Sequence, residues 1–210
     1  MEKKATKWLQ CELVILFVIV PVLLSSPIWI SLKVGLVFVA LGYCLGLSKK
    51  EGWFTRDLLF GGSMSIRPFL GRVLVVLSAA LGLMVVRDPE NLFLVVRKKP
   101  LLWLSILFFY SFFSVYPQEF LYRLFFFQRY RALFNSRWLL VVLNAIFFSL
   151  AHLMFWNGLV LILTIVGGLL FALTYERTKS LTLVSVEHAL YGCWLFTLGM
   201  GDMLGFPSPR

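Results

Sequence analysis

The sequence has few charged residues for its length and no long polar segment. Only 14% of its 210 residues are Asp, Glu, Lys or Arg, whereas 60% are hydrophobic. A soluble domain of this length carries about 25% charged residues. The sequence therefore excludes a water-soluble globular domain and predicts an integral membrane protein.

Cysteine is also scarce, and the three cysteines (Cys11, Cys44 and Cys193) lie in apolar segments without metal-ligand spacing. This pattern indicates small buried side chains, and it excludes a disulfide framework and a cysteine-based zinc site. The formal net charge is +10, but the basic residues form short clusters between apolar runs. Such clusters indicate membrane topology and contact with anionic lipid headgroups, and we expect no nucleic-acid partner.

The apolar runs predict an all-α, polytopic membrane helix bundle that forms one domain over residues 1–210. About 20 apolar residues are enough to cross about 30 Å of hydrocarbon. By this measure the chain has about seven transmembrane helices, within a range of six to eight. We expect them near residues 11–24, 28–47, 69–86, 101–131, 138–155, 158–175 and 181–200. The fourth is too long for a simple span, and Pro117 should kink or divide it.

Lysine and arginine predict the orientation of the bundle. If the helices alternate in direction, basic clusters near residues 3–7, 49–56, 129–137 and 177–179 share one side, which we expect to be cytoplasmic. The cluster Arg97-Lys98-Lys99 then falls on the opposite side. The hairpin around residues 87–100 is therefore predicted to be re-entrant or wrongly counted.

Ionisable residues inside the predicted spans are the strongest sign of function. The two histidines of the chain, His152 and His188, lie in the fifth and seventh predicted helices. Glu119 and Arg123 stand four residues apart in the fourth, where they share one helix face. Such groups are costly in hydrocarbon, and mutual contact in one interior cavity reduces that cost. A carboxylate and two imidazoles suit hydrolysis by activated water; the alternative is a polar network that only joins helices.

Three short motifs on separate predicted helices carry a family resemblance. They are Gln118-Glu119 followed by Arg123, Phe148-x-x-x-His152, and His188-x-x-x-Gly192. Over roughly residues 101–195 the series resembles the CAAX-protease and bacteriocin-processing (CPBP, or Abi-type) family of intramembrane proteases, whose motifs are Glu-Glu-x-x-x-Arg, Phe-x-x-x-His and His-x-x-x-Asn.

The resemblance implies an intramembrane endopeptidase, a hydrolase that acts on a peptide or lipidated protein substrate in contact with membrane lipids. In the family, a glutamate of the first motif and the Phe-x-x-x-His histidine activate water, and the last histidine and asparagine stabilise the oxyanion. The catalytic residues expected here are Glu119, Arg123, His152 and His188, with Gln118, Asn144 and Phe148 as accessory residues.

The sequence departs from the family pattern at Gln118 and Gly192. Adjacent helix positions differ by about 100° in direction, so Gln118 and Glu119 cannot point at one spot. Either local rotation at Pro117 lets Glu119 serve as the base, or Gln118 stands in the place of the base and the chain is an inactive binding or scaffold relative. Asn144, two turns before His152, either supplies the missing amide donor or packs helices.

Other interpretations are weaker. Glu119, His152 and His188 could together bind zinc, but the sequence has no His-Glu-x-x-His helix, and we expect no cofactor and no metal site. A proton-linked transporter also uses buried ionisable residues, but the sequence lacks the inverted repeat of many transporters. The compact chain without an organelle-retention signal favours a bacterial inner membrane.

Two further expectations concern side-chain environment. Glu187, next to His188 near the entrance of the seventh helix, is predicted to lie at the membrane interface and not to be catalytic. The aromatic run Phe125-Phe126-Phe127 is expected to contact lipid or to line a groove for a hydrophobic peptide.

Overall fold

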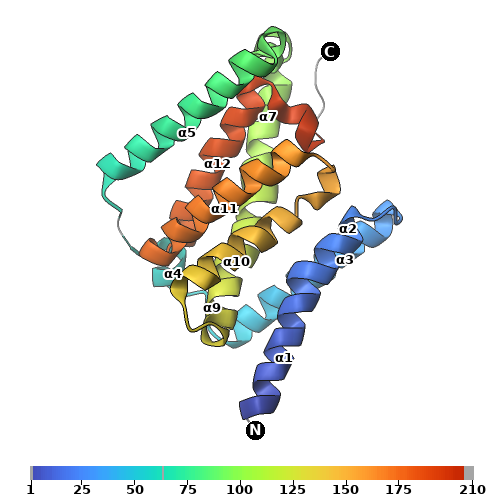
Figure 1. Ribbon diagram of the computed structural model, residues 1–210, viewed down its shortest axis with the longest axis vertical. Helices are drawn as coiled ribbons and strands as arrows, with labels where there is room; N and C mark the ends of the chain where they lie inside the picture. Colours follow the sequence, from blue (N-terminus) through green and yellow to red (C-terminus); the bar gives the residue numbers. More distant parts are fainter. Residues whose placement is uncertain (1, 63, 206–210) are drawn as a thin grey trace.

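The structure is a computed structural model that describes residues 2–62 and 64–205, and regular structure in these residues is entirely helical. Figure 1 shows the helices as one bundle. Its long elements are α1 (Glu2–Val14), which continues through η1 (Ile15–Ile19) into α2 (Val20–Ser25), and α3 (Ile30–Lys50), α5 (Ile66–Arg87), α10 (Arg137–Leu150), α11 (Gly158–Thr178) and α12 (Leu181–Leu198). A further long run consists of α7 (Pro100–Phe109), η3 (Tyr110–Val115), α8 (Tyr116–Glu119), η4 (Phe120–Phe125), α9 (Phe126–Tyr130) and η5 (Arg131–Leu133). Short elements connect these: α4 (Arg56–Phe60), η2 (Pro89–Asn91), α6 (Leu94–Lys98), η6 (Leu153–Phe155) and η7 (Met200–Leu204).

Seven of the helical segments are long and apolar enough to cross a membrane, which confirms the predicted all-α polytopic bundle. They cover Thr6–Ser25, Ile30–Lys50, Ile66–Arg87, Pro100–Leu133, Arg137–Phe155, Gly158–Thr178 and Leu181–Leu198. Each lies within a few residues of its predicted position. Hydrocarbon offers no hydrogen-bond partners to the backbone, whereas a helix pairs its own N–H and C=O groups. Long apolar runs in a membrane therefore fold as helices.

Side-chain caps start three of these helices. Ser136, Asn157 and Ser180 accept hydrogen bonds from the first backbone N–H groups of α10, α11 and α12, at 3.4, 3.0 and 3.2 Å. An N-cap of this kind satisfies a backbone donor that has no partner inside the helix. The caps therefore fix where the three helices begin. Of these helices, α10 carries Asn144 and Phe148, and α12 carries His188.

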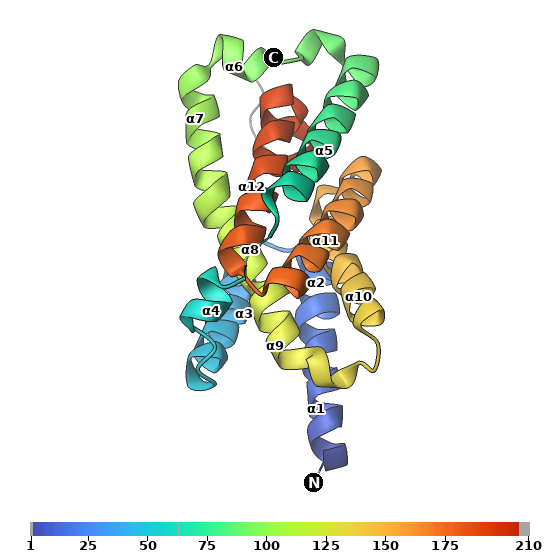
Figure 2. The same cartoon turned by 90° about the vertical axis from the view of Figure 1, so that its left-hand side faces the viewer.

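The spans alternate in direction between two ends of the bundle. The N-terminus lies at one end, with the connections after α3 and α9 toward the same end (Figures 1 and 2). The turn between α11 and α12 lies at the ends of these two helices that face the N-terminus, near mid-height in both views. These connections carry the basic clusters that were predicted to share one side. The connection between α5 and α7, which contains α6, lies at the opposite end (Figure 2). Both neighbouring spans are complete without residues 88–99, so the prediction that this hairpin was wrongly counted is wrong, and its re-entrant position stays a prediction.

The run Phe125-Phe126-Phe127 lies in the protein core, so the expectation that it contacts lipid is wrong. Phe125 and Phe126 are 0% exposed and Phe127 is 4% exposed. The ring of Phe17, on η1, packs edge-to-face on Phe126, with ring centroids 5.1 Å apart. Lipid tails are as apolar as the protein, so helix contact in a membrane depends on close packing, and edge-to-face aromatic pairs supply it.

A buried carboxylate ties the first helix to the bundle. Both Glu12 oxygens accept hydrogen bonds from Arg129, from Nε at 2.9 Å and from Nη2 at 2.8 Å. The hydroxyl groups of Tyr130 and Tyr43 each donate to the same carboxylate at 2.8 Å. Four hydrogen bonds from α3 and α9 compensate a charge on α1 that is 5% exposed, as a charge inside a membrane protein requires.

Candidate active site

The helical run from Pro100 to Leu133 positions the first group of polar residues. Pro117 was expected to kink or divide it. The chain is not divided there: it stays helical and winds into wider π-helical turns, η3 before the proline and η4 after it. Proline has no backbone N–H and its ring crowds the preceding turn, and a π-helical turn accommodates such a disturbance without ending the helix. The short segment α8, which contains Gln118 and Glu119, lies between the two.

Glu119 and Arg123 form the predicted ion pair. The Nε atom of Arg123 lies 3.2 Å from Oε2 of Glu119, and both side chains are 0% exposed. Arg123 also donates from Nη1 to Oδ1 of Asn144 at 2.6 Å, and Asn144 donates from Nδ2 to the Tyr122 carbonyl at 2.6 Å. The guanidinium stacks over the ring of Phe148, 4.9 Å from its centroid. The Arg123 guanidinium is therefore held by Glu119, by Asn144 and by the ring of Phe148.

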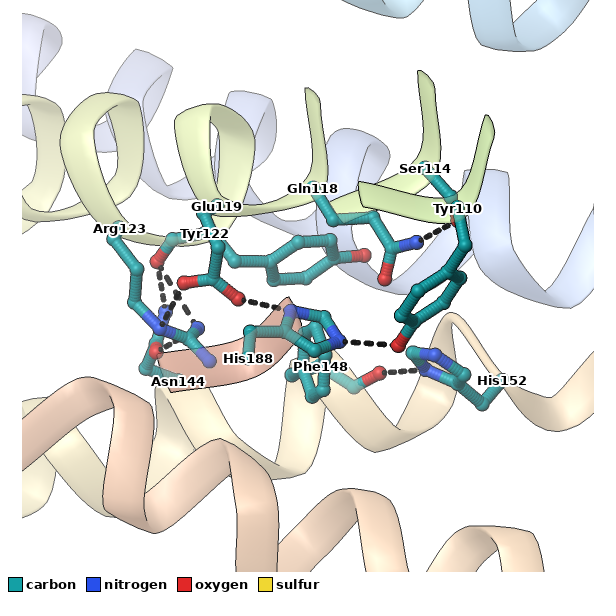
Figure 3. A network of polar contacts seen from close by, with 10 residues as sticks. All are labelled: Tyr110, Ser114, Gln118, Glu119, Tyr122, Arg123, Asn144, Phe148, His152 and His188. Carbon is teal, nitrogen blue, oxygen red and sulfur yellow. Dashed lines mark hydrogen bonds and ion pairs between the residues drawn. The ribbon is translucent and has the colours of Figure 1, made fainter. Parts of the chain in front are cut away.

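Glu119 also contacts His188, which completes a chain of polar groups across three segments (Figure 3). Oε1 of Glu119 lies 2.7 Å from Nδ1 of His188, and Nε2 of His188 lies 3.1 Å from the hydroxyl of Tyr110. Phe171 stacks on the imidazole with ring centroids 4.6 Å apart. The hydrogen bond between Tyr110 on η3 and His188 on α12 thus joins residues that are 78 positions apart in the sequence.

His152 lies within the fifth span, Arg137–Phe155, as predicted, at the point where α10 has ended and before η6 begins. Its ring Nδ1 lies 2.8 Å from the carbonyl of Phe148, and its backbone N–H bonds to Ser149. In a continuing α-helix the Phe148 carbonyl would accept from the backbone N–H of His152. Here the His152 side chain bonds to this carbonyl instead. A carbonyl only accepts, so Nδ1 carries the proton, and the neutral ring presents Nε2 as an acceptor.

Two cavities meet beside these residues. One, of about 310 Å³, lies among α5, α11 and α12, and His188 lines it. The other, of about 300 Å³, lies among η1, α2, α3 and η3, and Gln118 lines it. Tyr110 and His152 line both cavities. The polar chain from Glu119 therefore ends where two largely apolar cavities adjoin.

Residues 100–194 match the family model described as type II CAAX prenyl endopeptidase Rce1-like. This segment is Rce1-like. It contains all three motifs, and the match confirms the resemblance to the CAAX-protease family. No curated protein and no solved structure matches the chain. The segment that holds the candidate site is therefore similar to CAAX proteases.

Within the Rce1-like segment, Gln118 and Glu119 point to different surroundings, as their adjacent helix positions predicted. The Gln118 side chain donates from Nε2 to Oγ of Ser114 at 2.8 Å (Figure 3). Its Oε1 is buried and has no hydrogen-bond partner among the described residues. An amide therefore lines the second cavity together with His152, while the Glu119 carboxylate faces Arg123 and His188.

Two further polar residues in the Rce1-like segment lie close to this group. Tyr110 was not predicted to belong to the site, because a tyrosine in an apolar run does not indicate a contact with His188, 78 residues later. Glu187 is 0% exposed and so lies inside the protein, while its position at the level of the membrane interface stays a prediction. It accepts a hydrogen bond from Tyr191 at 2.9 Å and pairs with Arg72 at 2.8 Å. The basic residue that pairs with this buried carboxylate comes from α5, which precedes the Rce1-like segment.

The predicted residues divide into two groups around the ring of Phe148. The centroid of this ring lies 4.8 Å from that of His152 and 5.5 Å from that of His188. Glu119, Arg123, Asn144 and His188 lie in one continuous set of contacts, with His152 on the other side of Tyr110 (Figure 3). Within residues 2–62 and 64–205, no three Asp, Glu, His or Cys side chains are placed to hold a metal ion. The expectation that the protein needs no cofactor stays a prediction.

Proposed function

We propose that the protein is an intramembrane endopeptidase that cleaves a peptide bond in a membrane-associated or lipidated substrate. The observation that carries this proposal is the contact between Glu119 and His188, 2.7 Å long and buried, next to a cavity that His188 lines. A buried carboxylate that holds an imidazole orients the ring and stabilises the imidazolium that forms when the ring takes a proton. We place this reaction in a bacterial inner membrane and propose that it needs no cofactor.

In this proposal the carboxylate activates water through the imidazole. Glu119 accepts the Nδ1–H of His188, so that Nε2 serves as the general base for a water molecule in the cavity. Arg123 holds the carboxylate in place, because its Nε atom lies 3.2 Å from Oε2 of Glu119 and leaves Oε1 directed to His188. His152 presents a second nitrogen to both cavities and holds either the water or the leaving group.

The test compares new peptide termini in membranes that contain the wild-type protein and membranes that contain Glu119→Gln. Mass spectrometry of labelled amino termini detects cleavage whichever membrane protein is the substrate. We also expect cleavage of an internally quenched, farnesylated peptide that ends in Cys, two aliphatic residues and a variable residue. Glu119→Gln and His188→Gln should each lower the rate by at least about 100-fold. Glu176→Gln, which removes an ion pair with the exposed Lys179, is the control and should cleave like the wild type.

A second function is favoured by one observation. Gln118 places an amide, which cannot act as a general base, on the wall of the cavity that it shares with His152. On this view the protein binds a lipidated peptide without cutting it. Equal sets of peptide termini from wild type and Glu119→Gln, together with retention of the farnesylated peptide by the reconstituted protein, would establish that alternative and refute the peptidase.

A further inference from the structure

The hydroxyl group of Tyr110 occupies the space in which a side chain at position 192 would lie. A Cβ atom added to Gly192 would stand 2.0 Å from the Tyr110 hydroxyl oxygen and 2.4 Å from two atoms of its ring. No real Cβ approaches a neighbour so closely. Gly192 follows His188 by four residues on α12, so the two positions share a helix face. The absent side chain is therefore what lets Tyr110 reach the imidazole.

The direction of the hydrogen bonds in this chain follows from the chemistry of its members. An ionised carboxylate only accepts, so Nδ1 of His188 carries the proton that Glu119 receives. When the ring is neutral, Nε2 is an acceptor, and the Tyr110 hydroxyl, 3.1 Å away, donates to it. With its proton directed to His188, the Tyr110 oxygen presents lone pairs elsewhere. A lone pair of this kind accepts a hydrogen bond from water.

The position of Tyr110 makes this acceptor accessible to a substrate. Tyr110 lines both cavities, whereas His188 lines the first of them. Its ring is held edge-to-face against Phe196, with ring centroids 4.8 Å apart. The hydroxyl oxygen is thus held at the boundary between the two cavities, where a water molecule in either cavity can reach it.

We infer that Tyr110 is a catalytic residue that passes the proton of the attacking water to His188, and that Gly192 is required because it leaves room for the Tyr110 hydroxyl. This inference rests on the proposed peptidase function. As the water oxygen bonds to the carbonyl carbon, a water proton moves to the Tyr110 oxygen and the Tyr110 proton moves to Nε2 of His188. The carbonyl π pair moves to oxygen, and Glu119 stabilises the imidazolium. When the C–N bond breaks, the proton returns through Tyr110 to the leaving nitrogen.

The structural half of the inference is tested by ¹⁵N nuclear magnetic resonance of histidine-labelled protein in detergent micelles. The chain contains two histidines, so the spectrum contains two imidazole rings, and His152→Gln assigns them. We expect the His188 ring to be protonated on Nδ1. Tyr110→Phe, which keeps the ring and removes the hydroxyl, should shift Nε2 of His188 and leave the His152 ring unchanged. His188 resonances that are identical in wild type and Tyr110→Phe would overturn the inference.

The catalytic half is tested with the same variants in proteoliposomes and the farnesylated peptide. Tyr110→Phe should lower kcat by about 100-fold and change KM by less than about threefold, in the range expected for lost acid–base catalysis. Gly192→Ala, whose methyl group displaces the Tyr110 hydroxyl and ring, should lower kcat at least as far. Tyr116→Phe, on a tyrosine that is 42% exposed in the same run, and Gly35→Ala, where a Cβ meets no atom within 4 Å, are the matched controls.

The outcomes separate this inference from the proposed function. A wild type that cleaves, together with a Tyr110→Phe variant that cleaves equally well, overturns the role of Tyr110 and leaves the peptidase standing. A Gly192→Ala variant with wild-type kcat also overturns the inference. A wild type that generates no peptide termini beyond those of Glu119→Gln refutes the peptidase itself, and with it the catalytic role of Tyr110.

Discussion

The carboxylate of Glu119 lies 2.7 Å from Nδ1 of His188, and this contact joins α8 to α12 across 69 residues of sequence. Gln118, the neighbour of Glu119, lines a cavity that Glu119 does not line, and its side chain contacts Ser114. The two residues are adjacent in the chain, but their chemistry is therefore separable by mutation.

The first prediction follows from that separation. Gln118→Leu removes the amide from the second cavity but keeps an apolar side chain of similar size. If Glu119 and His188 carry the reaction, the variant should generate peptide termini within about threefold of the wild-type rate. A loss of about 100-fold or more in a variant that unfolds like the wild type would place Gln118 at the reaction centre and contradict the proposed role of Glu119.

The second prediction concerns the stability of the buried ion pair. Arg123→Met leaves the Glu119 charge without its guanidinium partner and should lower the free energy of unfolding by about 3–5 kcal/mol. Adding Glu119→Gln removes the stranded charge, so the double variant should recover at least about 1 kcal/mol. Unfolding in mixed SDS and detergent micelles, followed by tryptophan fluorescence, measures both changes.

The control for the ion pair is Arg137→Met. The Nε atom of Arg137 lies 3.8 Å from Glu176, and the Arg137 side chain is 75% exposed. An exposed pair of this kind contributes less than about 1 kcal/mol. Equal losses for Arg123→Met and Arg137→Met would show that the buried network does not determine stability.

The third prediction concerns the packing of α10 against α11. A Cβ at Gly168 would lie 3.1 Å from the Cα of Ala145 and 3.3 Å from its carbonyl oxygen, so the two backbones are already close. Gly168→Val must push α10 away, and we expect a loss of about 1–3 kcal/mol in the unfolding measurement. Gly35→Val, at a position with no atom within 4 Å of an added Cβ, should stay within about 0.5 kcal/mol. Equal effects at the two glycines would contradict the close approach.

The fourth prediction concerns the anchor of the first helix. Glu12→Ala removes the acceptor of four hydrogen bonds and leaves Arg129 unpaired, with an expected loss of about 3–5 kcal/mol. Tyr43→Phe removes one of the four, from a partly exposed tyrosine, and should lose less than about 1 kcal/mol. Below the unfolding transition, both variants should retain wild-type kcat, because Glu12 lies outside the proposed reaction centre. A selective loss of kcat would contradict this separation.

The fold was largely predictable because long apolar runs in hydrocarbon form helices. The positions of the seven spans found among the described residues follow from the lengths of these runs. The Glu119–Arg123 pair was predictable because four-residue spacing on a helix fixes the contact. Tyr110 and the burial of Phe125 through Phe127 were not predictable, since each depends on which helices pack together. His152 was correctly predicted within the fifth span, which covers Arg137–Phe155. The end of the regular α-helix at Leu150, two residues before His152, is a detail that the hydrophobic pattern does not show.

The anchor at Glu12 has a consequence for how the protein is made. Its guanidinium partner, Arg129, lies 117 residues later in the chain. At about 5–20 residues per second, the ribosome needs roughly ten seconds to supply it. During this interval the first helix holds a carboxylate without its final partner, either at the membrane surface or beside the insertion machinery. The helix that enters first would therefore be among the last to reach its final position.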